Sequence, residues 1–346
     1  MTHLINDAAH VVSDYLEGLA LANPHLVRLH EAPRFVARAD HPGLGSGRAP
    51  QVAVISGGGS GHEPLHCGFV GPGMLHAAVP GEVFTSPPPG PITAAIEIAD
   101  EGRGALCLVK NYTGDVLNFE TAIEFLDPDG PAVESVVIAD DVAVENSTFT
   151  AGRRGVAGTL VVEKVAGAAA QEGRDLAQVA AVARKATQCV ASMGMATAAG
   201  VNPATGRASF DLHDGEIEIG IGIHGEPGRA RIELAGADRI VDALLDPILA
   251  DLEPSAGEDV LLFVNGMGAT PDAELHIAYR RAHARLRDAG IRVTRSLVGS
   301  YVTSLNMAGL SLTVARFDDE LTALWDAPCH TPALTRIAPL SGTIET

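Results

Sequence analysis

The sequence predicts an α/β fold with a mostly parallel sheet, spread over about two domains. Its 346 residues are enough for two domains of roughly 150 residues each. Apolar runs of strand length alternate with amphipathic helical stretches, which is the pattern of βαβ units. Several of these runs end in polar or glycine-rich segments. Those segments are therefore expected beyond the carboxyl ends of the strands, where open α/β sheets bind ligands.

The first half of the chain supplies most of this alternation. Four apolar residues recur at helical spacing and predict an amphipathic helix that ends at about residue 22: Ile5, Val12, Leu16 and Leu19. Three strands are predicted in this half, at 51–55, 105–109 and 136–139. Two more helices are predicted at 92–100 and 117–126, followed by an alanine-rich helical region at 159–200.

The second half contains a segment that alternates strictly between apolar and polar or small residues. It predicts a strand at 216–224, with glycines and His224 on one face and four isoleucines on the core face: Ile217, Ile219, Ile221 and Ile223. Further helices are predicted at 238–251 and 271–289, and further strands at 260–264, 291–297 and 311–315. No linker marks a domain boundary, but small and turn-forming residues accumulate between 186 and 215.

The charge balance excludes several classes of partner. The 24 Lys and Arg residues are outnumbered by 43 Asp and Glu residues, which gives a formal net charge of -19. Such a surface repels phosphate backbones and anionic lipid head groups, so neither nucleic acid nor a membrane is expected as a partner. No apolar run approaches the ~20 residues of a membrane-spanning helix.

The cysteines and the amino terminus predict a cytoplasmic protein. The four cysteines form no CxxC pair, which suits reduced thiols: Cys67, Cys107, Cys189 and Cys329. The first residues lack a basic region before an apolar core, so no secretory signal is expected.

The stretch SGGGSGHEP at 56–64 is the first candidate site. It follows the apolar run 52–55, and its glycines let a ligand approach several backbone N–H groups beside an imidazole. A Walker A loop requires Lys followed by Ser or Thr where His62 and Glu63 stand. The dinucleotide fingerprint and the nucleophile elbow both require a glycine in place of His62. A glycine-rich turn without any ligand remains an alternative.

The segment His62-Glu63-Pro64-Leu65-His66 also fits the letters of the zinc-protease motif HExxH. That motif requires a helix interior that places both imidazoles on one face. Because Pro64 cannot lie in a helix interior, we expect no metal here.

Three further polar segments follow predicted strands. KNYTGD at 110–115 follows strand 105–109, and the pair Asp140-Asp141 follows strand 136–139. His224 ends its strand among glycines that clear space for a ligand. A histidine that only caps the strand by hydrogen bonds is the alternative for this position.

Eight motifs extend in order from residue 56 to residue 328: GGGSGHEP, FTSP, KNYTGD, DDVAVENS with AGRRGVAGT, GIHGEPG, NGMGATP, TSLNMAG and WDAP. In this order they resemble the ketone-binding K subunit of dihydroxyacetone kinases, over nearly the entire chain. The resemblance implies a homodimer of two-domain α/β subunits, with the second domain inserted so that the carboxyl-terminal segment returns to the first. The implied domains are residues 1–186 plus 316–346 and residues 187–315.

The resemblance also assigns roles to individual residues. The histidine of GIHGEPG, here His224, holds the ketone as a covalent hemiaminal, and His62 takes part in catalysis. Asp115 is the natural acceptor for the proton of the attacking hydroxyl, and Lys110 can neutralise developing charge. The implied substrate-binding residues are Gly59, Ser60, Gly61, His62, Ser86, Lys110 and Asp115.

The implied activity is phosphoryl transfer to an alcohol group of dihydroxyacetone. No nucleotide loop or magnesium-binding carboxylate cluster is evident, so we expect no cofactor on this chain. A nucleotide, ADP or ATP with Mg, is expected on a separate L subunit. That subunit either uses ATP directly or holds ADP that a phosphotransferase-system protein recharges. A kinase for another short ketose such as erythrulose, and a non-catalytic paralogue that signals dihydroxyacetone to a transcription regulator, remain alternatives. The positioned base Asp115 favours an enzyme.

Overall fold

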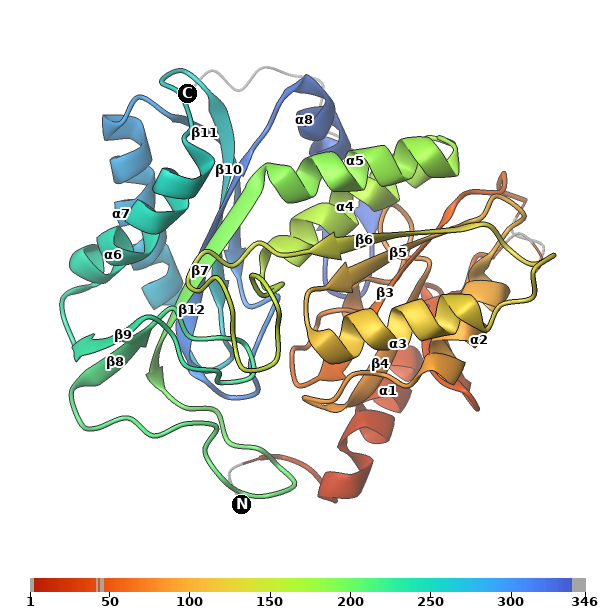
Figure 1. Cartoon of the computed structure of the whole chain (residues 1–346), viewed down its shortest axis with the longest axis horizontal. Coiled ribbons are helices and arrows are strands. Elements are labelled where there is room, and N and C mark those ends of the chain that lie inside the picture. Colours follow the sequence, from red (N-terminus) through yellow and green to blue (C-terminus); the bar gives the residue numbers. More distant parts are fainter. Residues whose placement is uncertain (1–2, 42, 44–46, 338–346) are drawn as a thin grey trace.

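Two six-stranded sheets and the helices around them build the molecule (Figure 1). This computed structural model describes residues 3–41, 43 and 47–337. The α-helices are α1 (Val11–Ala22), α2 (Pro89–Ala99), α3 (Thr113–Glu124), α4 (Gly158–Gln171), α5 (Leu176–Gln188), α6 (Ala237–Leu252), α7 (Asp272–Asp288) and α8 (Asp319–Asp326). None of these described helices combines the length and apolar character needed to cross a membrane.

The first sheet has the strand order β1-β2-β4-β3-β5-β6. Its strands are β1 (Val27–Glu31), β2 (Arg34–Arg38), β3 (Ala53–Ser60), β4 (Ala77–Val83), β5 (Ala105–Lys110) and β6 (Val133–Ile138). The last four run parallel, and β1 and β2 join antiparallel at one edge, which confirms the predicted mostly parallel sheet. Helices α2 and α3 cover one face, where Ile96 and Phe119 share a core with Ile55.

The second sheet has the order β11-β10-β12-β7-β8-β9 and is mostly antiparallel. Its strands are β7 (Val190–Ala198), β8 (Glu216–Ile219), β9 (Ala230–Glu233), β10 (Asp259–Gly266), β11 (Arg292–Gly299) and β12 (Ala308–Arg316). Helices α6 and α7 cover one face, and α4 and α5 lie between the two sheets (Figure 1).

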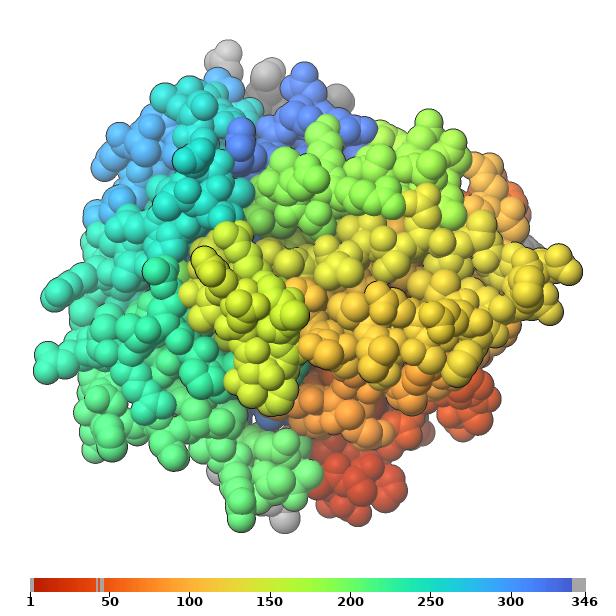
Figure 2. All heavy atoms as spheres, in the orientation of Figure 1, coloured from red at the N-terminus to blue at the C-terminus, as the bar shows by residue number. Residues whose placement is uncertain are grey.

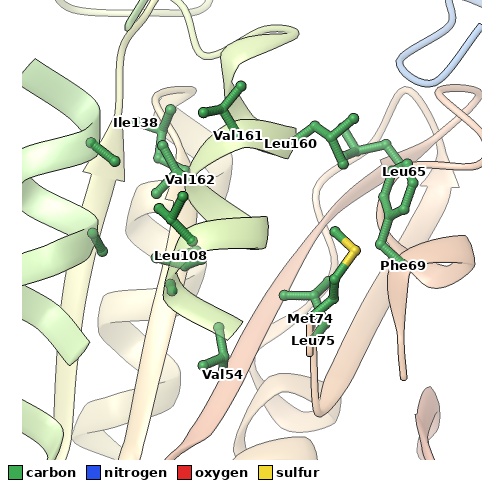
Figure 3. Close-up of a cluster of buried hydrophobic side chains, with 14 of the residues drawn as sticks. Val54, Leu65, Phe69, Met74, Leu75, Leu108, Ile138, Leu160, Val161 and Val162 are labelled. Atoms are coloured by element: carbon green, nitrogen blue, oxygen red, sulfur yellow. The ribbon is translucent and has the colours of Figure 1, made fainter. Parts of the chain in front are cut away.

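The composition of α4 explains why it can lie between two sheets. Every residue from Gly158 to Ala170 is buried, and most are Ala or Val, so the helix is apolar on nearly all faces. Figure 3 shows part of this core, in which Leu160 and Val162 of α4 belong to one cluster with Leu108 of β5. Helix α4 thereby connects the cores of the two halves.

The chain returns to the first half after β12. The ammonium of Lys164 on α4 donates a hydrogen bond to the carbonyl of Leu324 on α8 at 2.8 Å. The N–H of His330, in the short hairpin of β13 (Cys329–His330) and β14 (Thr335–Arg336), donates to the carbonyl of Pro72 at 2.9 Å. The second sheet is therefore inserted before the carboxyl-terminal segment, as expected. The boundaries at 186/187 and 315/316 stay predictions.

The segment between β6 and α4 bridges the two halves at the surface (Figure 2, yellow-green). The N–H of Val142 donates to the carbonyl of Ser192 on β7 at 2.9 Å. Further along, the carbonyl of Phe149 accepts from the N–H of Thr113, the first residue of α3, at 2.9 Å. The segment thus connects the second sheet with the start of α3.

The glycine-rich stretch belongs to a strand, so the loop predicted from residue 56 was wrong. Strand β3 continues through the three glycines to Ser60, and the chain turns only at Gly61, whose φ is +101°. Gly57 pairs with Val79 on β4 and with Val109 on β5. The glycines permit close packing of neighbouring groups within the sheet, so they do not end the strand.

Three other predicted elements differ from the structure. Residues 190–198, read as part of an alanine-rich helical region, form β7, because they lie between β12 and β8 within a buried sheet. The strand predicted at 216–224 ends at Ile219, because Gly220 turns the chain with a φ of +81°. Helix α3 begins four residues before the predicted start at 117. Strands β1, β2, β4 and β9 were not predicted.

Candidate active site

The glycines of β3 make room for a buried lysine. A methyl group on Gly58 would lie 2.2 Å from Nζ of Lys110, and one on Gly59 would lie 2.7 Å from the backbone nitrogen of Thr85. Lys110, at the end of β5, is almost fully buried, and its Nζ lies 3.7 Å from Oδ2 of Asp115. Burial lowers the pKa of Lys110, while the carboxylates of Asp115 and Glu163 oppose this change.

His62 follows β3 directly and is held by the second half of the chain. Its Nδ1 lies 2.8 Å from the carbonyl oxygen of Thr303. Because a carbonyl can only accept, His62 carries a proton on Nδ1 and leaves Nε2 as an acceptor. The N–H of Leu305 also donates to the carbonyl of Gly61 at 2.7 Å, and Oγ1 of Thr303 donates to the carbonyl of Glu63 at 2.8 Å. The loop before β12 therefore orients His62.

A carboxylate orients His224. Oε1 of Glu226 lies 3.0 Å from Nδ1 of His224, and Oε2 accepts the backbone N–H of the same residue at 2.9 Å. Although burial alone raises the pKa of Glu226, the charge and hydrogen bond of His224 and the nearby Arg154 lower it to about 2. The ionised carboxylate keeps a proton on Nδ1 of His224, so Nε2 is the nitrogen that can act as an acceptor or a nucleophile.

The two histidines face each other through their Nε2 atoms, which are 3.1 Å apart. Each ring already carries a proton on Nδ1, so a hydrogen bond between them needs one additional proton. Burial, followed by the charges of His224 and Lys110, holds the pKa of His62 well below its usual value. The ring of His62 is therefore neutral.

A pocket of about 520 Å³ opens in front of His224. About 15% of the side-chain surface of His224 is exposed, and the residue lines the pocket. Asp115, in the first turn of α3, also lines the pocket, and its Oδ1 is buried without a hydrogen-bond partner among the described residues. The lining residues are Gly59, Phe84, Thr85, Ser86, Tyr112, Gly114, Asp115, Asn118, Phe149 and His224.

The structure brings most of the predicted site residues together. Gly59, Ser86, Asp115 and His224 line the pocket, His62 contacts His224, and Lys110 lies behind Gly58 next to Asp115. Two predicted residues make other contacts. The hydroxyl of Ser60 donates to the carbonyl of Gly81 at 2.7 Å, and the N–H of Gly61 donates to the carboxylate of Glu63 at 3.0 Å.

Three residues around His224 were missed by the sequence analysis. Glu226 lies two residues after His224 in GIHGEPG, and a carboxylate so close to a candidate histidine is a usable signal. Phe84 stacks on His62 with ring centroids 5.2 Å apart, and Tyr112 meets His224 edge-on at 4.6 Å. Phe84 has a φ of +55°, a strained conformation that only the structure reveals.

The HExxH letters do not form a zinc-protease site. His62 points toward His224, while His66 points toward Lys110 from a segment of turns that precedes a short 3-10 helix. Over the described ranges, no group of three or more His, Cys, Asp or Glu side chains is arranged to hold a metal ion. The two imidazoles thus take part in two separate sets of contacts.

The family model of the Dak1 domain matches residues 17–333 of this chain. A curated relative from Escherichia coli (strain K12), the PEP-dependent dihydroxyacetone kinase, dihydroxyacetone-binding subunit DhaK, is 47% identical. That alignment covers 96% of this chain and 99% of the relative.

Two solved structures have the same fold over nearly the whole chain. The dihydroxyacetone kinase of C. freundii matches with a TM-score of 0.85 and 35% identity, covering all of this chain and 62% of that one. The dihydroxyacetone kinase operon co-activator Dha-DhaQ matches with a TM-score of 0.86 and 32% identity, covering 96% of this chain and 99% of that one. Relatives with this fold thus include both a kinase and a co-activator.

Proposed function

The chain belongs to the Dak1 domain family, and from that premise we propose that it is the dihydroxyacetone-binding subunit of a dihydroxyacetone kinase. The observation that carries this proposal is the orientation of His224. Glu226 keeps the proton on Nδ1, which leaves Nε2 as the reactive nitrogen of a ring that lines the pocket together with Asp115. A neutral imidazole nitrogen is nucleophilic and a ketone carbon is electrophilic, so the pair can form a covalent adduct.

The pair of histidines accounts for the proton that the adduct needs. A proton that bridges the two Nε2 atoms, 3.1 Å apart, first moves to His62. Nε2 of His224 then attacks the carbonyl carbon, the C=O π bond opens, and the oxygen takes the proton from His62 to become a hydroxyl. The alkylated ring of His224 keeps a positive charge, which the carboxylate of Glu226 neutralises at Nδ1.

The depressed pKa of His62 supports this direction of transfer. A histidinium at this buried position is a strong acid, so it gives its proton readily to an alkoxide that forms beside it. Glycerol has no carbonyl for His224 to attack, so the same arrangement selects a ketone over the corresponding alcohol.

Asp115 and Lys110 are proposed to serve the phosphoryl transfer. Oδ1 of Asp115 is free to accept the proton of the substrate hydroxyl that attacks phosphorus. The ammonium of Lys110, 3.7 Å from Oδ2, offsets the negative charge of the site. Phosphoryl transfer depends mainly on such positioning and charge neutralisation.

The donor is proposed to be carried by a separate L subunit with a nucleotide and Mg. The name of the Escherichia coli relative, a PEP-dependent kinase, supports a phosphotransferase-system protein as the source of the phosphoryl group. We also propose a homodimer, a cytoplasmic location, and the domain division 1–186 plus 316–346 and 187–315. ATP as the direct donor and another ketose such as erythrulose remain alternatives.

A sensor is the second candidate function, because a co-activator shares the fold at 32% identity. A sensor needs only the adduct on His224. The buried pair of Lys110 and Asp115 beside the pocket favours catalysis, since a base and a cation serve phosphoryl transfer.

The test is a carbon NMR spectrum of dihydroxyacetone labelled at its carbonyl carbon. The wild-type chain is expected to move this carbon from the ketone region to the tetrahedral region, and His224→Ala is expected to abolish the change. His213→Ala removes an exposed histidine of the same half and is the matched control. A tetrahedral signal that survives in His224→Ala would refute the assigned nucleophile.

A further inference from the structure

A line of buried polar groups lies behind the pocket, on the far side of Lys110. Nζ of Lys110 is 2.7 Å from Nε2 of His66, and Nδ1 of His66 is 2.5 Å from Oε1 of Glu163 on α4. Oγ of Ser56 lies 3.0 Å from the same Nδ1. His66, Lys110 and Glu163 are all almost completely inaccessible to solvent.

The direction of each hydrogen bond follows from the number of protons available. Burial, followed by the charges of Lys110 and His62, holds the pKa of His66 well below its usual value, so its ring is neutral. The ammonium of Lys110 can only donate, so Nε2 of His66 accepts and Nδ1 carries the proton. Ser56 already donates its hydroxyl hydrogen to the carbonyl of Leu108 at 2.8 Å. Nδ1–H of His66 therefore donates to Glu163 and Ser56.

His66 and Asp115 compete for the same ammonium. Nζ of Lys110 forms a short hydrogen bond with His66 at 2.7 Å but remains 3.7 Å from Oδ2 of Asp115, beyond hydrogen-bond distance. An ammonium in direct contact with a carboxylate would make that carboxylate a weaker base. The present arrangement leaves Asp115 with nearby positive charge and with one buried oxygen, Oδ1, that has no hydrogen-bond partner among the described residues.

We propose that His66 and Glu163 are positioning residues of this kinase site: they hold Lys110 away from Asp115, so that Asp115 remains basic enough to take the substrate proton. Glu163 acts through His66, because its carboxyl group accepts from Nδ1–H and fixes the tautomer whose Nε2 accepts from Lys110. The inference rests on the proposed function, because it concerns the base of that phosphoryl transfer.

Other charged groups around Lys110 and Asp115 do not replace this role. Tyr112 and His224 line the pocket, and burial raises the pKa of Tyr112 well above its usual value. Burial, followed by the charges of His224 and Lys110, lowers the pKa of His62. Gly57 offers only a carbonyl 3.4 Å from Nζ of Lys110. Among the described residues, only His66 forms a hydrogen bond shorter than 3 Å with the ammonium of Lys110.

A pair of variants at Glu163 separates positioning from simple packing. Glu163→Gln keeps an oxygen that can accept from Nδ1–H of His66, whereas Glu163→Met has similar length without an acceptor. In Glu163→Met, Nδ1–H of His66 keeps only Ser56, at 3.0 Å, as an acceptor, so the tautomer with its N–H on Nε2 becomes more populated. That N–H would displace the ammonium of Lys110 toward Asp115. Turnover with the L subunit, KM for dihydroxyacetone and the pH profile of kcat/KM are measured for each variant, with the labelled-carbon adduct as a check of folding.

Glu163→Met is expected to lower kcat by about tenfold or more and to move the acid limb of kcat/KM to lower pH, while adduct formation stays as in the wild type. Glu163→Gln is expected to keep kcat within about threefold of the wild type. Equal activity of the two variants, or an acid limb that does not move in Glu163→Met, would overturn the proposal.

A second pair of variants, at His66, tests the same positioning role if Glu163→Met does not fold. His66→Gln can place an oxygen near the position of Nε2 and should retain most of the activity, whereas His66→Asn is too short and should lose it. Equal activity of this pair would also refute the positioning role. Absence of turnover in the wild-type chain with the L subunit would refute the proposed function instead, which keeps the two failures distinct.

Discussion

Replacing Glu226 by Gln tests the most specific feature of the site, the carboxylate behind His224. The pKa of Glu226 falls from 4.5 to about 2 although burial opposes this, because the ionised form interacts with His224 and Arg154. That difference in pKa means that the surroundings favour the ionised form of Glu226 over the protonated form by about 3 kcal/mol. Gln also presents one acceptor and one donor where Glu226 accepts twice, from Nδ1–H and from the backbone N–H of His224.

We therefore expect Glu226→Gln to weaken the dihydroxyacetone adduct by about 10- to 100-fold, since 1.4 kcal/mol is a factor of ten and Arg154 accounts for part of the interaction. The assay is a titration of labelled dihydroxyacetone, with the tetrahedral carbon signal as the readout at neutral pH. Glu218→Gln is the matched control. Glu218 is also buried, on β8, but it accepts hydrogen bonds from Gly228 and Arg231 and none from His224.

A folded Glu226→Gln variant that binds dihydroxyacetone as tightly as the wild type would refute this role of the carboxylate. Such a result would mean that Nε2 of His224 carries the lone pair without help from Glu226. A loss of equal size in Glu218→Gln would instead indicate a general effect of a buried amide on this half of the molecule.

Three further predictions concern the groups on the Lys110 side of the pocket. Asp115→Asn should keep the adduct in the carbon spectrum and lower turnover with the L subunit by about 100-fold or more, because a proton acceptor is lost; normal turnover would show that another group is the base. Gly58→Ala should lower turnover about tenfold or more, because its methyl group would lie 2.2 Å from Nζ of Lys110, whereas Gly18→Ala, with no neighbouring atom within 4 Å, should leave activity unchanged. Burial raises the pKa of Glu163 from 4.5 to about 8, so the unfolded state releases this proton at lower pH than the folded state, and the wild type loses stability as the pH rises through that range. In urea denaturation, the free energy of unfolding of Glu163→Gln should therefore rise relative to that of the wild type by up to about 5 kcal/mol between pH 4 and pH 9, and a constant difference would contradict the raised pKa.

The order of strands and helices was predictable wherever periodicity was strong. The helices at 237–252 and 272–288 and the strands at 259–266 and 308–316 lie close to their predicted positions, because their apolar residues recur at clear helical or strand spacing. The alanine-rich stretch at 190–198 was misread because alanine favours helices locally, and its burial between two strands overrides that preference.

The candidate site was predictable as a set of residues but not as a set of contacts. Motif positions selected His62, Lys110, Asp115 and His224, which the fold brings to one pocket or directly behind it. Sequence spacing could not show that Lys110 passes beside Gly58, because that contact joins two neighbouring strands of the sheet. For the same reason, the sequence indicated two histidines in HEPLH without indicating that they point to different partners.

The hydrogen bond between His62 and Thr303 has a consequence for biosynthesis. The two residues are 241 positions apart, so the ring of His62 cannot acquire its final tautomer and orientation until the ribosome has delivered the segment around residue 303. A nascent chain that has completed the first sheet therefore carries the lysine and aspartate of the site but leaves this imidazole free to rotate. Competence for the proposed ketone capture is consequently one of the last properties that the growing polypeptide gains.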